Sequence, residues 1–332
     1  ATAAEQGGIL LNYAPVTALL RGADGFVDGV AAQDLESGQA FEARARIVVN
    51  AAGPFCDAVR RLADPAIPSM IRPSQGVHLV FGRDFLPGDS AIMVPHTDDG
   101  RVLFAVPWHE RILVGTTDTP VPAANLEPRP LADEVAFLLR HAARYLTRDP
   151  APSDVLCAFA GLRPLVRAGA AGNTASMSRE HLITTSASGL VSITGGKWTT
   201  YRRMGEEVVD VATKSAGLAI RPCGTESLPI HDFDGAGIDA LAAADPELAR
   251  PLHPRLPYRC ADVVWAARHE MARTVEDALS RRTRALLLDA RASMEAAPVV
   301  ARLLARETGR DEAWEGRQID LYRALAGAHL IA

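Results

Sequence analysis

Apolar and polar positions alternate along much of the first half of the chain. The alternation predicts strands over 76–82, 91–96, 101–108 and 111–118, joined by turns rich in Pro, Gly and Asp. Shorter strands are expected within 9–50, with a hairpin turn at Glu36, Ser37 and Gly38. Two more strands are expected over 156–166 and 179–185. Most of these strands should form an antiparallel sheet.

A helical period replaces the alternation in other parts of the chain. It predicts helices over 54–63 and 131–147, and it continues through most of the sequence after 257. Residues 223–257 are rich in Pro, Gly and Asp, which predicts a linker. Together these elements predict a mixed α/β (α+β) body followed by a helical C-terminal domain.

The stretch "LVSITGGKWTTYRRMGEEVVDVA", residues 190–212, predicts a strand that stops at two glycines and a helix directly after them. Thr199 and Thr200 suit the helix N-cap. The apolar face of the helix is expected to carry Tyr201, Met204, Val208 and Val211. Free backbone N–H groups at such a helix start favour an anionic or electron-rich ligand. The alternative is a tight turn in which glycine serves only a positive φ.

A second junction of the same kind lies earlier in the chain. The stretch "ARIVVNAAG", residues 45–53, predicts a buried strand that ends in small residues, and the helix over 54–63 follows it. By contrast, "GAGIDA" at 235–240 has the form of a dinucleotide fingerprint but follows "HDFD" and no apolar strand. We therefore do not expect a nucleotide there.

Composition excludes several classes of protein. Of the 332 residues, 48% are apolar and 23% charged, as in globular proteins, and the net charge of −5 argues against a nucleic-acid partner. The four cysteines form no C-x-x-C pair, so neither a metal site nor a disulfide framework is expected, and a cytoplasmic compartment is the default. Neither an 18-residue apolar run nor a signal peptide is present. The opening "ATAAEQGGILLNY" indicates a start inside a domain.

Several quoted stretches together resemble one family. They are "ARIVVNAAGPF", "RPSQGVHLVF", "ILVGTTDTP", "FAGLRPLV", "SREHLI", "TGGKWTTYRRMGE" and "VVWAARHEMARTVEDALSRRTR". In order and register, from about 8 to about 290, they resemble the FAD-dependent, quinone-reducing glycerol-3-phosphate dehydrogenases of the glutathione-reductase-like flavoprotein superfamily. That family opens with a strand, a G-x-G-x-x-G turn and a helix for the ADP half of FAD, which this sequence lacks.

The resemblance implies a domain organisation. Residues 1–68 would be a partial FAD-binding domain, 69–165 the substrate-binding antiparallel sheet, 166–222 a returning FAD-binding segment and 223–332 the helical C-terminal domain. The fold class is then an incomplete glutathione-reductase-like FAD domain with a substrate domain and a helical domain.

The resemblance also implies site residues. The turn Gly195, Gly196, Lys197, Trp198 and Thr199 would lie under the pyrimidine end of the flavin, and Ala52, Gly53 and Pro54 would pass close to the cofactor. Arg163 and Arg179 would hold the substrate phosphate. His78 would take the hydroxyl proton or orient the substrate. No metal ligand is implied.

Each assignment has a plainer alternative. The segment 51–54 could serve only strand–helix packing, Arg163 could be a structural ion-pair partner, Arg179 an exposed strand charge and His78 a hydrogen-bonded strand residue. The turn "GTTD" at 115–118 is expected to lie near the flavin without chemistry of its own. Surface or interdomain positions are expected for His181, His269, Arg281, Arg282 and Arg284.

The function implied is oxidation of sn-glycerol 3-phosphate to dihydroxyacetone phosphate, with electrons passed through FAD to quinone. Peripheral contact with the inner face of the cytoplasmic membrane is implied too, and self-association is expected because a shortened flavin domain exposes sheet edges. The alternatives are an oxygen-using glycerophosphate oxidase and a non-catalytic fragment or interaction domain without bound FAD. An amino-acid oxidase is less favoured, because it needs no two arginines for a phosphate.

Overall fold

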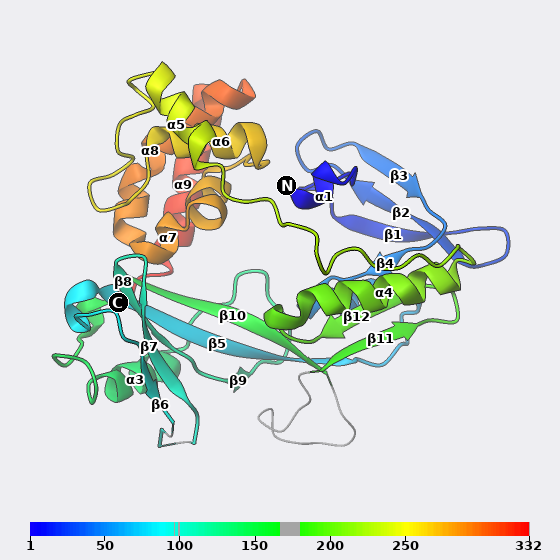
Figure 1. Ribbon diagram of the computed structural model, residues 1–332, viewed down its shortest axis with the longest axis horizontal. Coiled ribbons are helices and arrows are strands. Elements are labelled where there is room, and N and C mark those ends of the chain that lie inside the picture. Colours follow the sequence, from blue (N-terminus) through cyan, green and yellow to red (C-terminus); the bar gives the residue numbers. More distant parts are fainter. Residues whose placement is uncertain (96, 99, 167–179, 332) are drawn as a thin grey trace. The chain divides into compact units, whose positions relative to one another are not determined.

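The computed structural model describes residues 1–95, 97–98, 100–166 and 180–331 (Figure 1). The chain folds into two compact units whose segments alternate along the sequence. Unit 1 comprises 1–75, 118–126 and 162–231, and unit 2 comprises 76–117, 127–161 and 232–332. Mixed α/β architecture with antiparallel sheets and a helical C-terminal region confirms the predicted fold class.

A small sheet in unit 1 contains both strands that lead into glycine junctions. Its order is β11 (His181–Thr185), β12 (Val191–Gly195) and β4 (Val49–Asn50), with β12 antiparallel to β11 and parallel to β4. Helices α2 (Cys56–Ala63) and α4 (Tyr201–Ser215) pack on β12. The predicted buried strand over 45–50 contributes only two residues to β4.

The core of this sheet is small. Val191, Ile193 and Val208 are buried at its centre, and Met204 and Val211 pack against them. The helical period therefore places Met204, Val208 and Val211 correctly, whereas Tyr201 is 48% exposed and lies outside this core.

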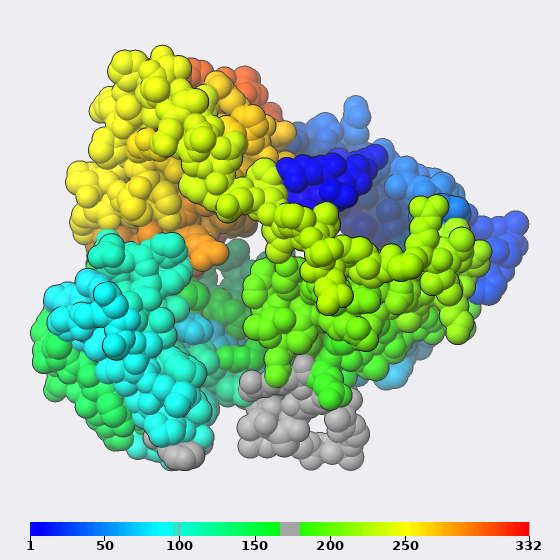
Figure 2. Space-filling view, viewed as in Figure 1, coloured from blue at the N-terminus to red at the C-terminus, as the bar shows by residue number. Residues whose placement is uncertain are grey.

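A second sheet of unit 1 is a three-stranded antiparallel meander. It consists of β1 (Val16–Arg21), β2 (Val27–Gln33) and β3 (Ala40–Arg44). The predicted hairpin turn is confirmed between β2 and β3, and Gly38 there has φ +77°. The short helix α1 (Thr2–Glu5) lies beside the segment that ends unit 1 (Figure 2). Thr2 Oγ1 accepts the His231 N–H at 2.7 Å.

The large antiparallel sheet confirms the alternation seen in the sequence. Its strands are β5 (Ile71–Gly82), β6 (Ile92–Val94), β7 (Leu103–Trp108), β8 (Arg111–Gly115) and β10 (Cys157–Val166), in the order β10-β5-β8-β7-β6, and β9 (Thr119–Pro120) pairs with the start of β5. In unit 2, Val77, Leu79 and Phe81 are buried on one face and pack with Leu138 of α3 (Ala132–Ala142).

Unit 2 ends in a helical region. It contains α5 (Gly235–Ala244), α6 (Cys260–His269), the π-helix η6 (Asp277–Arg282), α7 (Ala285–Leu288), α8 (Ala290–Thr308) and α9 (Glu312–Gly327). Within the described residues, the short 3₁₀ helices are η1 (Gly53–Phe55), η2 (Arg83–Phe85), η3 (Pro152–Asp154) and η5 (Trp198–Thr200). α8 packs against both α6 and α9 around a core of small and aliphatic residues.

The prediction of a linker over 223–257 is wrong in its middle, where α5 forms. Asp234 caps this helix by accepting the Gly237 N–H at 2.9 Å, and Ile238 and Ala242 are buried in the helical core. A Cβ on Gly237 would lie 2.3 Å from the Trp265 ring. The glycine therefore allows a close approach of α5 to α6, and "GAGIDA" opens a packed helix.

Two kinds of feature are absent from the described residues. Within these ranges, no helix is both long and apolar enough to cross a membrane. The same part of the chain contains no group of three or more His, Cys, Asp or Glu side chains placed to hold a metal ion. The four cysteines are free, and Cys223 is the exposed one among them.

We expect Gly237→Ala to lower the free energy of unfolding by roughly 1–3 kcal/mol, because its Cβ overlaps the Trp265 ring. Gly316→Ala in α9 is the matched control. A Cβ there meets nothing within 4 Å, so this change should be stabilising by about 0.5–1 kcal/mol. Urea unfolding of both variants measures the difference, and equal midpoints would contradict the packing described here.

Candidate functional site

The two glycine junctions lie next to each other because β4 and β12 run parallel. Val191 pairs with Val49 and Ser192 with Asn50, so both strands end at the same edge of the sheet. Thr194 Oγ1 donates a hydrogen bond of 3.4 Å to the carbonyl of Gly53, which links one junction to the other. Ligands of open α/β sheets bind at the carboxyl ends of parallel strands. This edge is therefore the candidate site.

A buried asparagine shapes the first junction. Asn50 is 4% exposed, and its Nδ2 donates to the Cys56 carbonyl at 3.0 Å and to Ser192 Oγ at 3.3 Å. Its Oδ1 accepts the Ala52 N–H at 3.2 Å. The side chain thus fixes the segment that passes through Ala52, Gly53 and Pro54 into α2. The polar residue at the end of an apolar strand was the sequence signal for this role, which our sequence analysis missed.

Both glycines of the second junction are required by the backbone and by packing. Gly195 and Gly196 have φ of +79° and +77°. A Cβ on Gly195 would lie 2.7 Å from the Glu180 carbonyl oxygen, and one on Gly196 would lie 2.4 Å from Met204 Sδ. A side chain at either glycine would therefore clash with the unit on which the turn rests.

The start of η5 presents backbone donors. Lys197, Trp198 and Thr199 are exposed, and the Trp198 ring, 86% exposed, stacks on Tyr201 at 5.4 Å. Thr200 occupies the N-cap of α4, and its Oγ1 accepts the Lys197 N–H at 3.3 Å. Among the described residues, the N–H groups of Trp198 and Thr199 have no hydrogen-bond partner. An electron-rich group could accept from both.

Arg163 is held by a carboxylate. Its Nη1 lies 3.4 Å from Asp118 Oδ1, and Ser74 Oγ donates to the same oxygen. The ion pair fixes the guanidinium of Arg163, whose side chain is 29% exposed. Asp118 ends the "GTTD" stretch, so that turn supplies the partner that sequence reasoning did not assign. The other predicted phosphate ligand, Arg179, lies outside the described residues.

His78 belongs to unit 2 and is described with its own neighbours. It pairs across the sheet with Gly115, and a Cβ at Gly115 would lie 2.3 Å from His78 Cδ2. The imidazole also stacks on Phe159, with ring centroids 5.4 Å apart and planes 16° apart. The ring is therefore packed between a glycine and an aromatic side chain, and its role as a base stays a prediction.

The neighbouring Thr117 has a structural role. Its Oγ1 accepts the Val77 N–H at 3.0 Å and donates to Glu134 Oε1 at 2.8 Å. The second oxygen of Glu134 accepts the Leu131 N–H at 3.0 Å. Thr117 and Glu134 are 1% and 5% exposed. These buried hydrogen bonds therefore connect the turn at 115–118 to the start of α3.

The histidines and arginines expected at surfaces have specific neighbours. His181 pairs with Glu207 at 2.7 Å. In unit 2 the His269 ring stacks on Trp265 at 3.9 Å. The arginines of unit 2 are engaged as well: Arg281 with Asp277 and Glu276, Arg282 with the Glu270 carbonyl, and Arg284 over the Trp108 ring.

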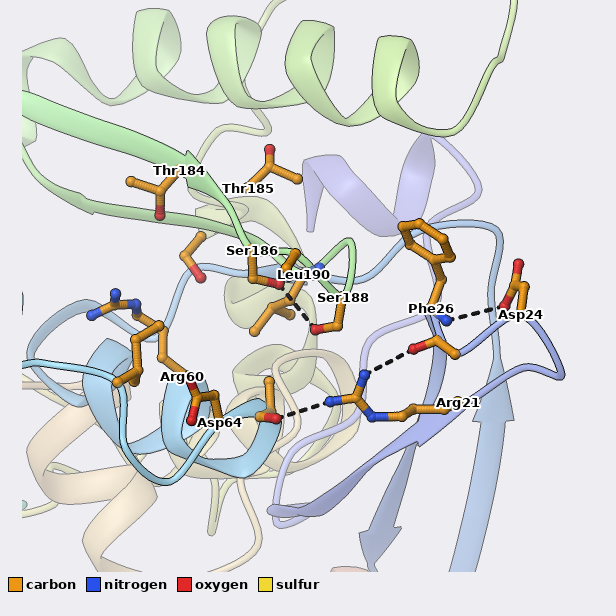
Figure 3. A pocket seen from close by; sticks show the side chains of 15 residues that line it. Arg21, Asp24, Phe26, Arg60, Asp64, Thr184, Thr185, Ser186, Ser188 and Leu190 are labelled. Carbon is orange, nitrogen blue, oxygen red and sulfur yellow. Dashed lines mark hydrogen bonds between the residues drawn. The ribbon is translucent and has the colours of Figure 1, made fainter.

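A cavity of about 450 Å³ lies at the amino-terminal end of β12 (Figure 3). Arg21 and Arg60 line it opposite the hydroxyls of the β11–β12 hairpin. Arg21 donates hydrogen bonds to the carbonyls of Gly25 and Ala63 at 2.8 and 2.9 Å. Its guanidinium is therefore engaged with backbone carbonyl groups. The predicted cofactor-binding residues, all of them described, do not line this cavity. We therefore place the candidate site at the glycine junctions.

Parallel strands that end side by side in two glycine junctions, each followed by a helix, are typical of a cofactor-binding α/β protein. Residues 1–202 match the family described as FAD dependent oxidoreductase, and residues 235–315 match the C-terminal domain of alpha-glycerophosphate oxidase. The first match covers more than half of the chain. The protein belongs to the family of FAD-dependent oxidoreductases.

Individual relatives are similar over nearly the whole chain. The mitochondrial glycerol-3-phosphate dehydrogenase of Homo sapiens is 33% identical over 97% of this chain and 50% of its own length. That of Arabidopsis thaliana is 34% identical over 96% of this chain and 58% of its own length. The chain thus spans about half the length of these relatives. The structure of the Bacillus halodurans glycerol-3-phosphate dehydrogenase complexed with FAD has a TM-score of 0.80 and 26% identity, covering 99% of this chain and 71% of that one.

We expect the Asp57 carboxylate, in the helix that follows the first junction, to make stability depend on pH. Burial raises the pKa of Asp57, but hydrogen bonds from the Ile71 and Met70 N–H groups and from Arg60 outweigh it and leave that pKa lowered. A carboxyl whose pKa is lower in the folded state stabilises the fold above its unfolded pKa of about 3.9, and this contribution is lost as the pH falls through the folded value.

Asp57→Asn should therefore cost about 1–3 kcal/mol of unfolding free energy at pH 7, and the difference from wild type should shrink below about pH 4. Urea unfolding between pH 7 and pH 3 measures it. Asp64→Asn, at an exposed carboxylate after the same helix, is the control. A loss for Asp57→Asn that stays constant down to pH 3 would contradict the ionised carboxylate.

Proposed function

We propose that this chain carries the flavin-contacting and C-terminal parts of an enzyme that oxidises sn-glycerol 3-phosphate to dihydroxyacetone phosphate with FAD. The observation that carries the proposal is the pair of glycine junctions linked by Thr194 and Gly53. The names of the relatives support it, since each is a glycerol-3-phosphate dehydrogenase and the Bacillus halodurans structure is complexed with FAD.

The residues at the junctions fit the flavin end of FAD. The turn Gly195–Gly196 carries no side chain that would keep a flat ring away, and the N–H groups of Trp198 and Thr199 are without partners in the described structure. A helix start favours the negative charge that a reduced flavin carries on its pyrimidine ring. The residues that would hold this end are Ala52, Gly53, Pro54, Gly195, Gly196, Lys197, Trp198 and Thr199.

The remaining roles fall on three side chains. Arg163, oriented by Asp118, would bind the phosphate dianion, and Arg179 would be the second cation. His78 would take the proton of the C2 hydroxyl as the hydride leaves C2, which leaves a ketone. FAD, when bound, supplies the hydride acceptor.

A second candidate, the oxygen-using glycerophosphate oxidase, is favoured by the family match over 235–315, whose description names that activity. The two candidates share the substrate and the flavin and differ in what oxidises the reduced cofactor. Reoxidation of the substrate-reduced protein by air with formation of hydrogen peroxide would favour the oxidase, and reoxidation by a soluble quinone would favour the dehydrogenase.

Quinone as acceptor and peripheral attachment to the inner face of the cytoplasmic membrane belong to the same proposal. Self-association is proposed too, because unit 1 exposes Val209, Ile220 and Ile230 by 59%, 72% and 68%. Flotation with vesicles of anionic lipid tests attachment, and size-exclusion chromatography tests self-association. Absence from the vesicle fraction would contradict the first and a monomer the second.

We expect the purified chain with FAD to show a flavin absorption spectrum that bleaches when glycerol 3-phosphate is added without oxygen. The bleaching follows from hydride transfer at C2. Glycerol without phosphate is the control, and it should leave the spectrum unchanged at the same concentration. If the chain retains no flavin absorption once unbound FAD has been removed, the proposal is overturned in favour of a non-catalytic fragment.

We expect Arg163→Ala to weaken binding of glycerol 3-phosphate by roughly 10- to 150-fold, the loss of one charge-assisted hydrogen-bonded contact. Arg163→Lys should recover only part of this loss, because ammonium cannot bind phosphate in two-point fashion. Arg44→Ala, at a 53% exposed arginine of β3, is the matched control. Isothermal titration measures the affinities, and an affinity of Arg163→Ala equal to that of the control would assign the arginine to structure alone.

A further inference from the structure

His181 joins β11 to α4 across the glycine turn. It is the first residue of β11 and pairs with Gly195 at the end of β12. Its Nε2 donates to Glu207 Oε2 at 2.7 Å, and the other oxygen of Glu207 accepts from Arg203 Nε at 2.6 Å. Glu207 and Arg203 both belong to α4. We call the three side chains the clasp.

The glycine turn lies within the clasp. A Cβ on Gly196 would lie 3.3 Å from His181 Cβ and 2.4 Å from Met204 Sδ, so these two side chains form the surface on which the turn rests. His181 comes from β11 and Met204 from α4. The turn therefore rests on side chains from both β11 and α4, and the bond between His181 and Glu207 is a direct polar contact between these two elements.

The charges of the clasp are balanced within it. The hydrogen bond from Arg203 first and that from His181 second lower the pKa of Glu207, so its carboxylate is ionised at neutral pH. Both of its oxygens face donors. The clasp therefore places no unpaired anion beside a turn whose backbone donors suit an electron-rich ligand.

We propose that His181, Glu207 and Arg203 are positioning residues that hold the Gly195–Thr199 turn, and with it the N–H groups of Trp198 and Thr199, in one orientation for the cofactor. This inference rests on the function proposed above and deepens it. Donors fixed in advance stabilise charge better than donors that must reorient. An exposed ion pair within one helix would contribute little, but His181 and Glu207 connect two elements that flank the turn.

The test compares two carboxylates one residue apart on α4. Glu207→Gln breaks the bond to His181, whereas Glu206→Gln removes the same charge from a residue whose bond of 2.9 Å is to Arg202 and which lies 3.7 Å from Arg203, so the bond between β11 and α4 stays intact. Hydrogen exchange, followed by mass spectrometry, reports on the peptide that covers 195–200 without any cofactor. FAD affinity, from quenching of flavin fluorescence, is the second measurement on the same proteins.

We expect Glu207→Gln and His181→Ala to speed exchange of this peptide about tenfold and to weaken FAD binding by a similar factor, while Glu206→Gln changes neither. His181→Gln keeps an amide donor and should restore part of the protection. Equal exchange in Glu207→Gln and Glu206→Gln would overturn the proposal.

Two further outcomes are distinguishable. If Glu207→Gln also loses protection over β2, the fold is disturbed, and His181→Ala with its His181→Gln rescue then decides. If the wild-type chain shows no FAD binding, the proposed function fails, while the exchange rates still show whether the clasp orders the turn.

Discussion

The short parallel pairing of β12 with β4 is the contact on which the candidate site depends. β4 is only two residues long, yet it brings residues 51–54 beside the turn at 195–196, more than 140 positions later in the sequence. Asn50 makes this pairing specific, because its buried amide bonds to Ser192 on one strand and to the helix after the other. A buried amide without those partners would be costly. The side chain of Asn50 therefore contributes to the packing, the hydrogen bonding and the geometry of the site.

Sequence patterns predicted the helices, strands and turns whose signals lie within a short stretch of the chain. Alternation located β5, β7 and β8, and the glycine pair with a following helical period located β12 and α4, because these signals lie within one element. Tertiary partners had no such signal. Asp118 for Arg163, Glu207 for His181 and Glu134 for Thr117 come from segments distant in the sequence. Helix α5 was missed because Gly235 and Gly237 indicated a turn, whereas Gly237 allows a close approach to Trp265.

The most distinctive C-terminal stretch of the sequence, 268–284, owes its pattern to structure. Asp277 is 4% exposed, accepts the Arg273 N–H at 2.9 Å and pairs with Arg281 at 2.9 Å. Arg282 Nε donates to the Glu270 carbonyl at 2.8 Å. These bonds define the bend that leads into the π-helix and then into α7. Residues 268–284 strongly indicate the family, and their role is structural, in the helical region of unit 2. The proposed chemistry is assigned to other residues.

The alternation of the two units along the chain has a consequence for synthesis on the ribosome. Unit 1 lacks β11, β12 and α4 until residue 215 has emerged, and unit 2 lacks α9 until residue 327 has emerged, although each unit begins within the first 76 residues. The early strand β4 must therefore wait for β12, made more than 140 residues later, and β5 pairs with β8 before its other neighbour, β10, has been made. Such a nascent chain would be a natural client for chaperones that bind extended apolar segments.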